Sequence, residues 1–483
     1  MDAGKDLILD INGLKTGVPM TKRTIIAFAV AISLFVIGCF LPLQQFSEKA
    51  GMALGLVLAT VSLWIFNILP TIIPCLIMVV IALLTGMLDL SQVQTTLGSS
   101  AVYATMGLVI VSMGAEKSNI AKRLACVLGK RLGKRPTLII LALGIASAIM
   151  SAFVSNTATV IMMAGIGAAV LKAMGEEPGK SKFGSAMILL IAASTSIGGS
   201  ALINGCPGIN GMCISLLENA TSTKVSYNEW AKFGVIAGIV IMIPAWLIYT
   251  KCAKIKNEDL KRIDPTYFGE LANELGPVSG SEIRWMITVV AMVVSLLCGL
   301  PLPVAGLLFG LITILPMVGT VSGRDAMKNM PFDVIIMCGL VPLYGNLFNN
   351  TGLSVMFGGA VSSILPENSA LLVIMIPALL MALLNNLFVN AGAGIAAICV
   401  GAAAPVIQAM GYNPAVCMLP TMMLCGYTIG FGTHVQMMIT YGYGYWEMNE
   451  AIKPGFLLVT LAAIVYSVLL AVLAPVLGLS LML

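Results

Sequence analysis

The chain has 483 residues, of which 59% are hydrophobic and 10% are charged, and its mean hydropathy is +1.00. These values exclude a soluble globular protein, because such proteins carry about 25% charged residues. The net charge of +5 does not indicate nucleic-acid binding, because the cations fall between apolar segments, where they report orientation in a membrane. The 11 cysteines are scattered without a CxxC motif, so the sequence predicts no disulfide framework or metal site.

Apolar segments recur along the whole chain and must be solvated by lipid. A bilayer core about 30 Å thick requires about 20 apolar residues per helix. Unpaired backbone groups are costly in hydrocarbon, so each crossing is expected to be helical. We predict an all-α polytopic membrane protein with about eleven crossings, near 24–43, 51–67, 71–88, 101–115, 184–215, 231–250, 285–299, 302–319, 333–365, 413–440 and 454–478.

The first quarter of the chain is predicted to be a leader followed by scaffold helices. Residues 1–23 are polar and too long for the n-region of a cleavable signal, so we expect a cytoplasmic leader and a retained first helix. Residues 24–135 are assigned to the scaffold. Within them, apolar residues recur at helical spacing among Lys and Arg in 118–136. This pattern favours an amphipathic helix at the membrane surface, and a plain basic loop is the alternative.

Residues 136–171 are predicted to form a re-entrant hairpin. Arg135 and Lys172 flank it, which places both of its ends in the cytoplasm. Ser155-Asn156-Thr157 lies near its centre, so two helical arms would carry this polar tip about 25 Å into the membrane. Polar backbone at that depth is tolerated only beside protein or a water-filled cavity. The tip is therefore a candidate binding site, and hydrogen bonding between helices is the alternative.

Glycine-rich breaks interrupt the helix after this hairpin. They are Ser196-Ile197-Gly198-Gly199 and Gly205-Cys206-Pro207-Gly208. We assign 136–217, the hairpin with its broken helix, to a transport domain. Residues 218–250 are predicted to form the next membrane helix, and 251–284 a cytoplasmic connector.

The second half is predicted to repeat this arrangement. Residues 285–365 are assigned to scaffold helices and the start of the second half, 366–440 to a second hairpin with its broken helix in the transport domain, and 441–483 to a loop and the last membrane helix. Asn385, Asn386 and Asn390 lie near the second tip, and Gly430-Phe431-Gly432-Thr433-His434 marks the second break. Paired hairpins entering from opposite sides are typical of inverted-repeat transporters, whose binding site lies at the midplane.

The distribution of Lys and Arg predicts the orientation. With the N-terminus in the cytoplasm, all of the 26 cations except Lys49, Lys224 and Lys232 fall on the cytoplasmic side. We therefore expect a multi-pass protein of the cell inner membrane with a cytoplasmic N-terminus and an external C-terminus.

The predicted spans contain little ionisable chemistry. Only His434 lies clearly inside them, so a relay of buried carboxylates is not expected. Helix N-termini can instead hold an anion, and helix C-termini and unwound carbonyls can hold Na⁺. An enzyme is not expected, because no metal-ligand cluster or nucleophile with a base is present. Two interpretations of His434 are open. It contacts the substrate or a proton, or it is a packed histidine with its hydrogen bonds satisfied.

These motifs resemble the divalent anion/sodium symporter family, whose members carry di- and tricarboxylates and in some cases sulfate. The similar elements are Ser155-Asn156-Thr157-Ala158-Thr159, Ser196-Ile197-Gly198-Gly199, and Tyr441-Gly442-Tyr443-Gly444 leading into Ile452-Lys453-Pro454-Gly455. The resemblance implies a homodimer that couples transport of a small organic anion to Na⁺. It also implies that the transport domain slides against a dimerising scaffold in an elevator-like motion.

The resemblance also implies the site residues. The residues expected to bind Na⁺ are Ser155, Asn156, Gly198, Gly199, Asn390 and Gly432. The residues expected to bind substrate are Asn156, Thr157, Cys206, Asn390, Thr433 and His434. The sequence departs from the family at Val389-Asn390-Ala391, where hydroxyls are lost, and at His434 and Cys206. These departures leave open a sodium-independent anion exchanger of the same fold, or a carrier of another oxyanion.

Overall fold

The structure is a computed structural model that describes residues 21–133, 135–255, 266–365, 369–388, 392–430 and 434–483. The described residues are predominantly helical, and ten of their helices are long and apolar enough to cross a membrane. Each of the eleven predicted crossings overlaps one of these ten or a shorter apolar helix. The prediction of an all-α, multi-pass membrane protein is confirmed.

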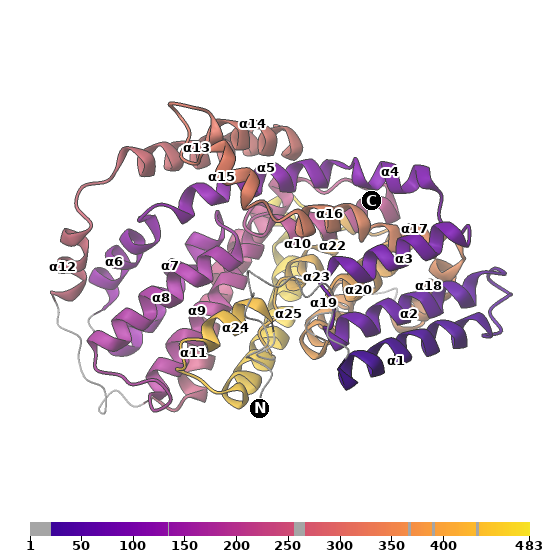
Figure 1. The fold of residues 1–483 in the computed structure, drawn as a ribbon, viewed down its shortest axis with the longest axis horizontal. Coiled ribbons are helices and arrows are strands. Elements are labelled where there is room, and N and C mark those ends of the chain that lie inside the picture. The colour runs from indigo at the N-terminus through magenta and orange to yellow at the C-terminus, as the bar shows by residue number, and fades with distance from the viewer. Residues whose placement is uncertain (1–20, 134, 256–265, 366–368, 389–391, 431–433) are drawn as a thin grey trace.

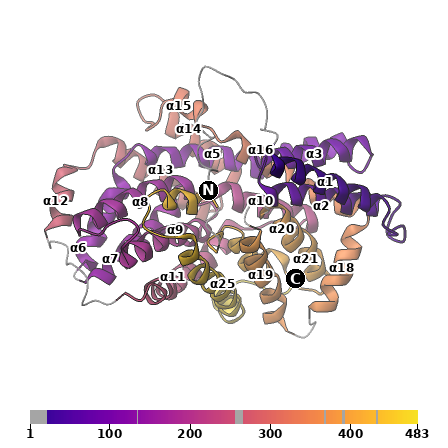
Figure 2. The same ribbon diagram turned by 60° about the horizontal axis from the view of Figure 1, so that its bottom comes forward.

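The helices of the first half run in close succession. They are α1 (Lys22–Cys39), α2 (Ala50–Phe66), α3 (Ile72–Leu84), α4 (Leu90–Leu97), α5 (Ser100–Glu116), α6 (Ile120–Leu132), α7 (Pro136–Ser151), α8 (Asn156–Ala173), α9 (Lys182–Ala201), α10 (Pro207–Thr221), α11 (Tyr227–Cys252) and α12 (Tyr267–Glu274). In Figures 1 and 2, α1, α2 and α3 lie at one end of the molecule, and α6, α7, α8 and α12 lie at the other.

The second half is built from more and shorter helices. They are α13 (Gly280–Leu297), α14 (Leu302–Ile314), α15 (Gly323–Lys328), α16 (Phe332–Leu340), α17 (Leu343–Asn350), α18 (Leu353–Ile364), α19 (Ala370–Leu387), α20 (Gly392–Ala396), the π-helix η1 (Ala397–Ala402), α21 (Ala403–Ala409), α22 (Pro414–Cys417), α23 (Leu419–Leu424), α24 (Val435–Tyr441) and α25 (Met448–Leu477).

Residues 333–365, read from the sequence as one crossing, form the three helices α16, α17 and α18. Pro342 lies between the first two, and proline cannot donate a helical hydrogen bond. Gly352 separates the last two with a φ of +70°, a conformation that glycine adopts readily. The segment therefore has an interruption of its helical hydrogen bonding at Pro342 and a turn at Gly352 within the length that the apolar pattern suggested for one span.

Two close helix pairs define the frame around the site. Helices α5 and α14 touch at Gly107 and Gly306, where a Cβ atom on Gly306 would lie 2.9 Å from the Ala104 carbonyl oxygen. Helices α7 and α9 form the second pair, and α11 packs on both of them. Small residues at such contacts let helix backbones approach closely.

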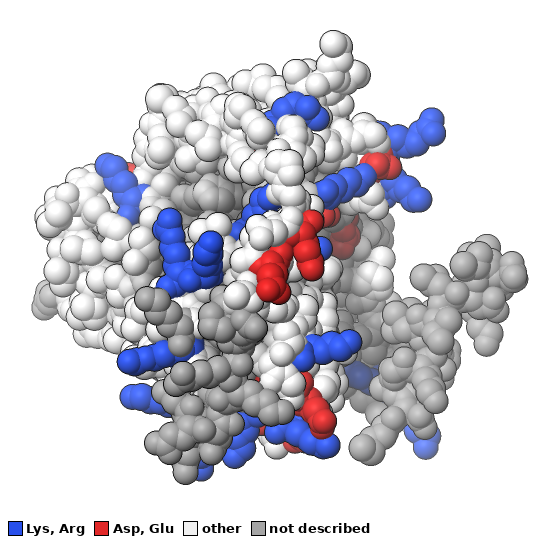
Figure 3. All heavy atoms as spheres, turned by 90° about the vertical axis from the view of Figure 1, so that its left-hand side faces the viewer, with Lys and Arg blue, Asp and Glu red and all other residues white. Residues whose placement is uncertain are grey.

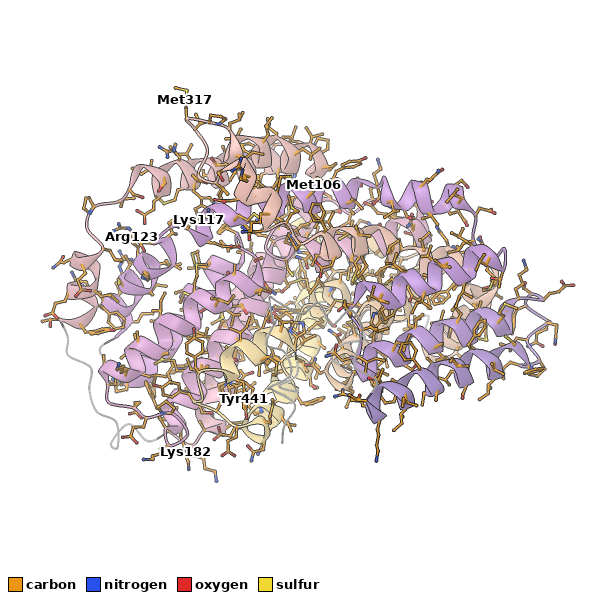
Figure 4. The ribbon with its side chains drawn as sticks, in the orientation of Figure 1. Met106, Lys117, Arg123, Lys182, Met317 and Tyr441 are labelled. Atoms are coloured by element: carbon orange, nitrogen blue, oxygen red, sulfur yellow. The ribbon has the colours of Figure 1, made fainter. Side chains whose placement is uncertain are left out.

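The predicted amphipathic segment forms α6, which packs on α7 and α12. Arg123 on α6 joins it to the start of α13 (Figure 4). Its Nε donates to both carboxylate oxygens of Glu282 at 3.1 and 3.2 Å, and its other nitrogens donate to the carbonyls of Leu275, Gly276 and Pro277. The Glu282 side chain is 1% exposed, so this cluster is a fixed joint between the two halves.

Cations are concentrated at the end of the molecule formed by α6, α7, α8 and α12. Figure 3 shows this end, where Lys and Arg side chains outnumber those of Asp and Glu. On an adjoining loop, Lys117 donates to Asp325 at 2.5 Å. This hydrogen bond and the Lys117 charge hold the pKa of the Asp325 carboxyl below its ordinary value. The contact links the end of α5 to α15.

Candidate functional site

The first candidate tip is the turn 152–155 between α7 and α8. Pro136 starts α7, where its missing N–H is not needed. Ser155 caps α8, because its hydroxyl accepts a hydrogen bond from the Ala158 amide at 3.4 Å. Helices α7 and α8 pack on each other and on α9. The two helices have 16 and 18 residues, so the predicted helical arms and polar turn are present, and their re-entrant placement in a membrane stays a prediction.

Asn156 is held in one position at this tip. It is the first residue of α8 and is 5% exposed. Its Oδ1 accepts a hydrogen bond from Ser151 Oγ at 2.7 Å. On its other side the amide lies against Gly199 of α9, so closely that a Cβ atom there would overlap Asn156 Oδ1. Asn156 is therefore clamped between the end of α7 and the glycine-rich part of α9, whereas the neighbouring Thr157 is exposed.

Glycines allow the tip to press against the broken helix. A Cβ atom on Gly198 would overlap the Ala148 carbonyl, and one on Gly205 would lie 2.6 Å from the Ser151 carbonyl oxygen. No side chain of any size fits at these positions without movement of the backbone. The structure thus brings Ser155, Asn156, Gly198 and Gly199 into one place, as the sequence predicted for one ion site.

Asparagine side chains satisfy the backbone of the break between α9 and α10. Asn210 Nδ2 lies within 3.0 to 3.2 Å of three carbonyl oxygens, those of Gly199, Leu202 and Ile203. Asn204 Nδ2 donates to the Ala152 carbonyl at 2.8 Å, which ties the break to the hairpin turn. Cys206 is half-buried and directly precedes Pro207, the first residue of α10.

The asparagines of the second half brace an extended segment instead. Asn386, at the end of α19, donates from Nδ2 to the carbonyls of Ala382 and Tyr427, both at 2.7 Å. Its Oδ1 accepts from the amides of Ile429 and Gly430 at 2.9 and 2.7 Å. Asn385 Nδ2 donates to the Cys425 carbonyl at 2.7 Å. Residues 425–430 thus obtain from side chains the hydrogen bonds that a helix would supply.

The remaining predicted residues are only partly described. Asn390, Gly432 and Thr433 lie outside the described residues. His434 directly precedes α24, and its Nδ1 is buried and has no hydrogen-bond partner among the described residues. Two residues further on, Gln436 Oε1 accepts from Ser196 Oγ of α9 at 3.0 Å. This bond places the second broken helix beside the first.

The structure adds three residues that the sequence reasoning did not select. Ser151 orients Asn156, and Asn204 and Asn210 support the break. The Oδ1 atom of Asn210 is buried and, within the described part of the chain, has no hydrogen-bond donor. A polar residue in an otherwise apolar helix was the only signal in the sequence, because its partners lie 7 to 11 residues away across a break.

The oxygen atoms at this site suit a hard cation. They comprise the Asn156 amide oxygen, the Ser155 hydroxyl and the carbonyls of the break, and unwound carbonyls of this kind hold Na⁺ in transporters. The N-terminus of α8 lies at the tip, and α10 begins directly after the break. Free N–H groups at helix N-termini attract an anion. The region around the first tip and the break therefore offers ligands for a cation and for an anion.

Known proteins resemble this chain in sequence. The sodium-dependent dicarboxylate transporter SdcS of Staphylococcus aureus (strain MRSA252) is 24% identical over 462 residues, which is 90% of this chain and 88% of that protein. Its namesake from Staphylococcus saprophyticus is 27% identical over 222 residues, 44% of this chain and 42% of that protein.

Two solved structures share the fold. The YdaH transporter of Alcanivorax borkumensis has a TM-score of 0.52 at 15% identity, covering 80% of this chain and 86% of that one. MtrF of Neisseria gonorrhoeae, described with a class of antimetabolite efflux pumps, has a TM-score of 0.56 at 13% identity, covering 81% and 84%. At these identities the likeness shows the fold alone. A citrate transporter family model (CitMHS) matches residues 61–426. This match confirms the resemblance found in the sequence, and the chain belongs to the citrate transporter family as a divalent anion/sodium symporter family member.

Proposed function

We propose that this protein is a secondary active transporter of a small di- or tricarboxylate, coupled to Na⁺, in the cell inner membrane. The observation that carries the proposal is the clamped position of Asn156 between Ser151 and Gly199. A packing contact between helices would not require a polar amide at a turn, held against a glycine whose Cβ atom would overlap it. A binding site requires such fixed geometry, because each ligand atom must be held in place.

In this proposal Na⁺ and the substrate carboxylate are bound by largely separate sets of ligands. Na⁺ binds the Asn156 and Ser155 side chains with carbonyls near Gly198 and Gly199, and Asn390 and Gly432 contribute from the second half. The substrate carboxylate is held by Asn156, Thr157, Thr433, His434 and Asn390 with the N–H groups of α8 and of α10 beside Cys206. A carboxylate and Na⁺ in adjacent positions neutralise each other, which lowers the cost of burying either one.

The same proposal includes an elevator-like motion of a homodimer. The transport domain comprises 136–217 and 366–440, and the bond from Ser196 to Gln436 joins these two parts. The scaffold includes α5 and α14, whose glycine contact makes them a rigid pair. The N-terminus is cytoplasmic and the C-terminus external in this arrangement.

A sodium-independent exchanger of the same fold is the second candidate. Val389 and Ala391 lack the hydroxyls that the resemblance led us to expect beside Asn390, which weakens a second Na⁺ site. His434 supplies an imidazole nitrogen that has no partner among the described residues, and the N–H of a neutral imidazole can donate a hydrogen bond to an anion.

The test is counterflow of radiolabelled succinate or citrate into proteoliposomes, with Na⁺ or K⁺ as the cation and sulfate as a competitor. A Na⁺-dependent carrier shows accelerated exchange that is lost in K⁺. Exchange of succinate or citrate at an equal rate in both salts favours the exchanger. Strong inhibition of that exchange by sulfate favours a carrier of another oxyanion. Absence of succinate and citrate flux, with the purified protein folded, would overturn the proposed function.

A further inference from the structure

An apolar groove runs along the outer surface of the candidate transport domain, behind the first hairpin. Its volume is about 480 Å³, within the range of ligand-binding cavities. Helix α7 with its turn, α9 and α11 each form one side, and Gly198 and Gly238 belong to the lining. All of the described residues that line it are aliphatic, phenylalanine, methionine or glycine, and none carries a polar side chain.

The groove faces hydrocarbon. Ile149 of α7 is 43% exposed, and Ile239 and Ile243 of α11 are 67% and 48% exposed. Ile239 and Ile243 lie on α11, a helix of 26 residues that is long and apolar enough to span the membrane, and Ile149 lies on the shorter apolar helix α7. In a bilayer such a surface is covered by lipid chains, and an empty groove would forfeit their dispersion contacts.

Cations lie at one end of the same two helices. Trp246 Nε1 of α11 donates to the Thr137 carbonyl of α7 at 2.9 Å, so the last turns of α11 lie beside the first turn of α7. Arg135 precedes α7 and Lys251 lies in the last turn of α11, and both are exposed. Ile243 is separated from Lys251 by about 12 Å of helix, a distance shorter than one leaflet of the hydrocarbon core, about 15 Å.

We propose that this groove is a lipid-binding site that holds an acyl chain of an anionic phospholipid, with the headgroup on Arg135 and Lys251. The uncharged groove and the cationic end match the two parts of such a molecule, and basic residues beside membrane helices bind anionic headgroups.

The lipid would support the hairpin from behind. Gly198 lines the groove and touches the Ala148 backbone, and the next residue, Gly199, touches Asn156. An acyl chain in the groove therefore resists displacement of α7 from α9, the contact that clamps the tip. Its effect on transport rests on the proposed function, whereas lipid binding itself does not.

The experiment uses the purified full-length protein in nanodiscs that contain phosphatidylglycerol with a photoreactive diazirine near the end of one acyl chain. Phosphatidylcholine with the same chain is the comparison. We expect labelled peptides from 145–153 and 235–243. Neutralising Arg135 and Lys251 by Arg135→Gln and Lys251→Gln should lower labelling about fivefold for each cation removed. Lys232→Gln, at the other end of α11, should not lower it.

A second pair of variants tests the groove. At Gly238 a Cβ atom would lie 3.5 Å from Ala201 Cβ and 3.7 Å from Ile197 Cγ2, an ordinary contact. Gly238→Leu should therefore fold, fill the groove and abolish labelling there. Val240→Leu, on the same helix and outside the groove, should label like wild type. Ile239→Trp fills the groove from the α11 side and replaces Gly238→Leu if that variant does not fold.

Three results would overturn the proposal. They are equal labelling of Gly238→Leu and wild type, equal labelling by the two lipids, and disulfide formation between two copies through Ile239→Cys, which would show that a second chain covers the groove. Labelling is measured without substrate, so a protein that fails to transport carboxylates can still confirm the lipid site.

Discussion

The substitution Gly199→Ala tests the candidate site with a single methyl group. That methyl would overlap Asn156 Oδ1 and lie 2.8 Å from Cγ and 2.9 Å from Nδ2. The amide must then move by about 1 Å, and a misplacement of that size costs on the order of 100-fold in the function of a positioned group. The lost hydrogen bond from Ser151 costs about 1 kcal/mol, and the gain of alanine over glycine within a helix returns about the same amount.

Because the methyl also overpacks a buried contact, we expect Gly199→Ala to fold with a stability lowered by about 1 to 3 kcal/mol and to lose almost all succinate or citrate transport. The assay is initial-rate uptake in proteoliposomes beside a thermal unfolding curve. Gly345→Ala in α17 is the matched control, because nothing lies within 4 Å of its added Cβ atom, and it should transport normally. Wild-type rates in Gly199→Ala would refute the reasoning that Gly199 fixes Asn156 at a binding site.

Other variants test the candidate site at Asn156, the Asn386 hydrogen bonds to 427–430, the Arg123–Glu282 ion pair and the membrane orientation. Asn156→Ala should abolish transport but leave expression intact, and normal transport would remove Asn156 from the site. Asn386→Leu leaves the Tyr427 carbonyl and the amides of Ile429 and Gly430 without the partners that Asn386 supplies. This variant should lower the free energy of unfolding by about 3 kcal/mol. In thermal unfolding curves its loss of stability should exceed that of Asn386→Asp. Arg123→Ala leaves the Glu282 carboxylate buried and uncompensated, which costs about 3 kcal/mol, and Arg123→Lys should recover only part of that. A membrane-impermeant maleimide added outside intact cells should label the exposed thiols of Cys39 and Cys298, and labelling only after permeabilisation would reverse the predicted orientation.

The sequence predicted the helices of this fold closely where charged residues flank an apolar segment of informative length. The first hairpin was predictable because Arg135 and Lys172 flank an apolar run that is too long for one crossing. Its arms are α7 and α8, and its polar tip lies at Ser155 and Asn156. The predicted break at Gly205-Cys206-Pro207-Gly208 is present between α9 and α10, whereas the predicted break at Ser196-Ile197-Gly198-Gly199 is wrong, because these residues lie inside α9.

Contacts between distant residues could not be predicted from one sequence. The partners of Asn204 and Asn386 lie 52 and up to 44 residues away, and no periodicity links such positions. The division of 333–365 into three helices was missed because apolar length outweighed the turn signals at Pro342 and Gly352. The ligand sets and the domain boundaries remain predictions.

The asparagine-braced segments affect the energetics of any displacement through the membrane. The carbonyls of Gly199, Leu202 and Ile203 bond to Asn210, and backbone groups of 425–430 bond to Asn385 and Asn386. These hydrogen bonds travel with the domain, so moving it along the bilayer normal neither makes nor breaks them. The work of such a step then comes from exchanging contacts with lipid chains for contacts with the scaffold helices, two environments of similar polarity. A broken helix braced by its own side chains can thus cross a low-dielectric barrier at nearly the same electrostatic energy as an intact one.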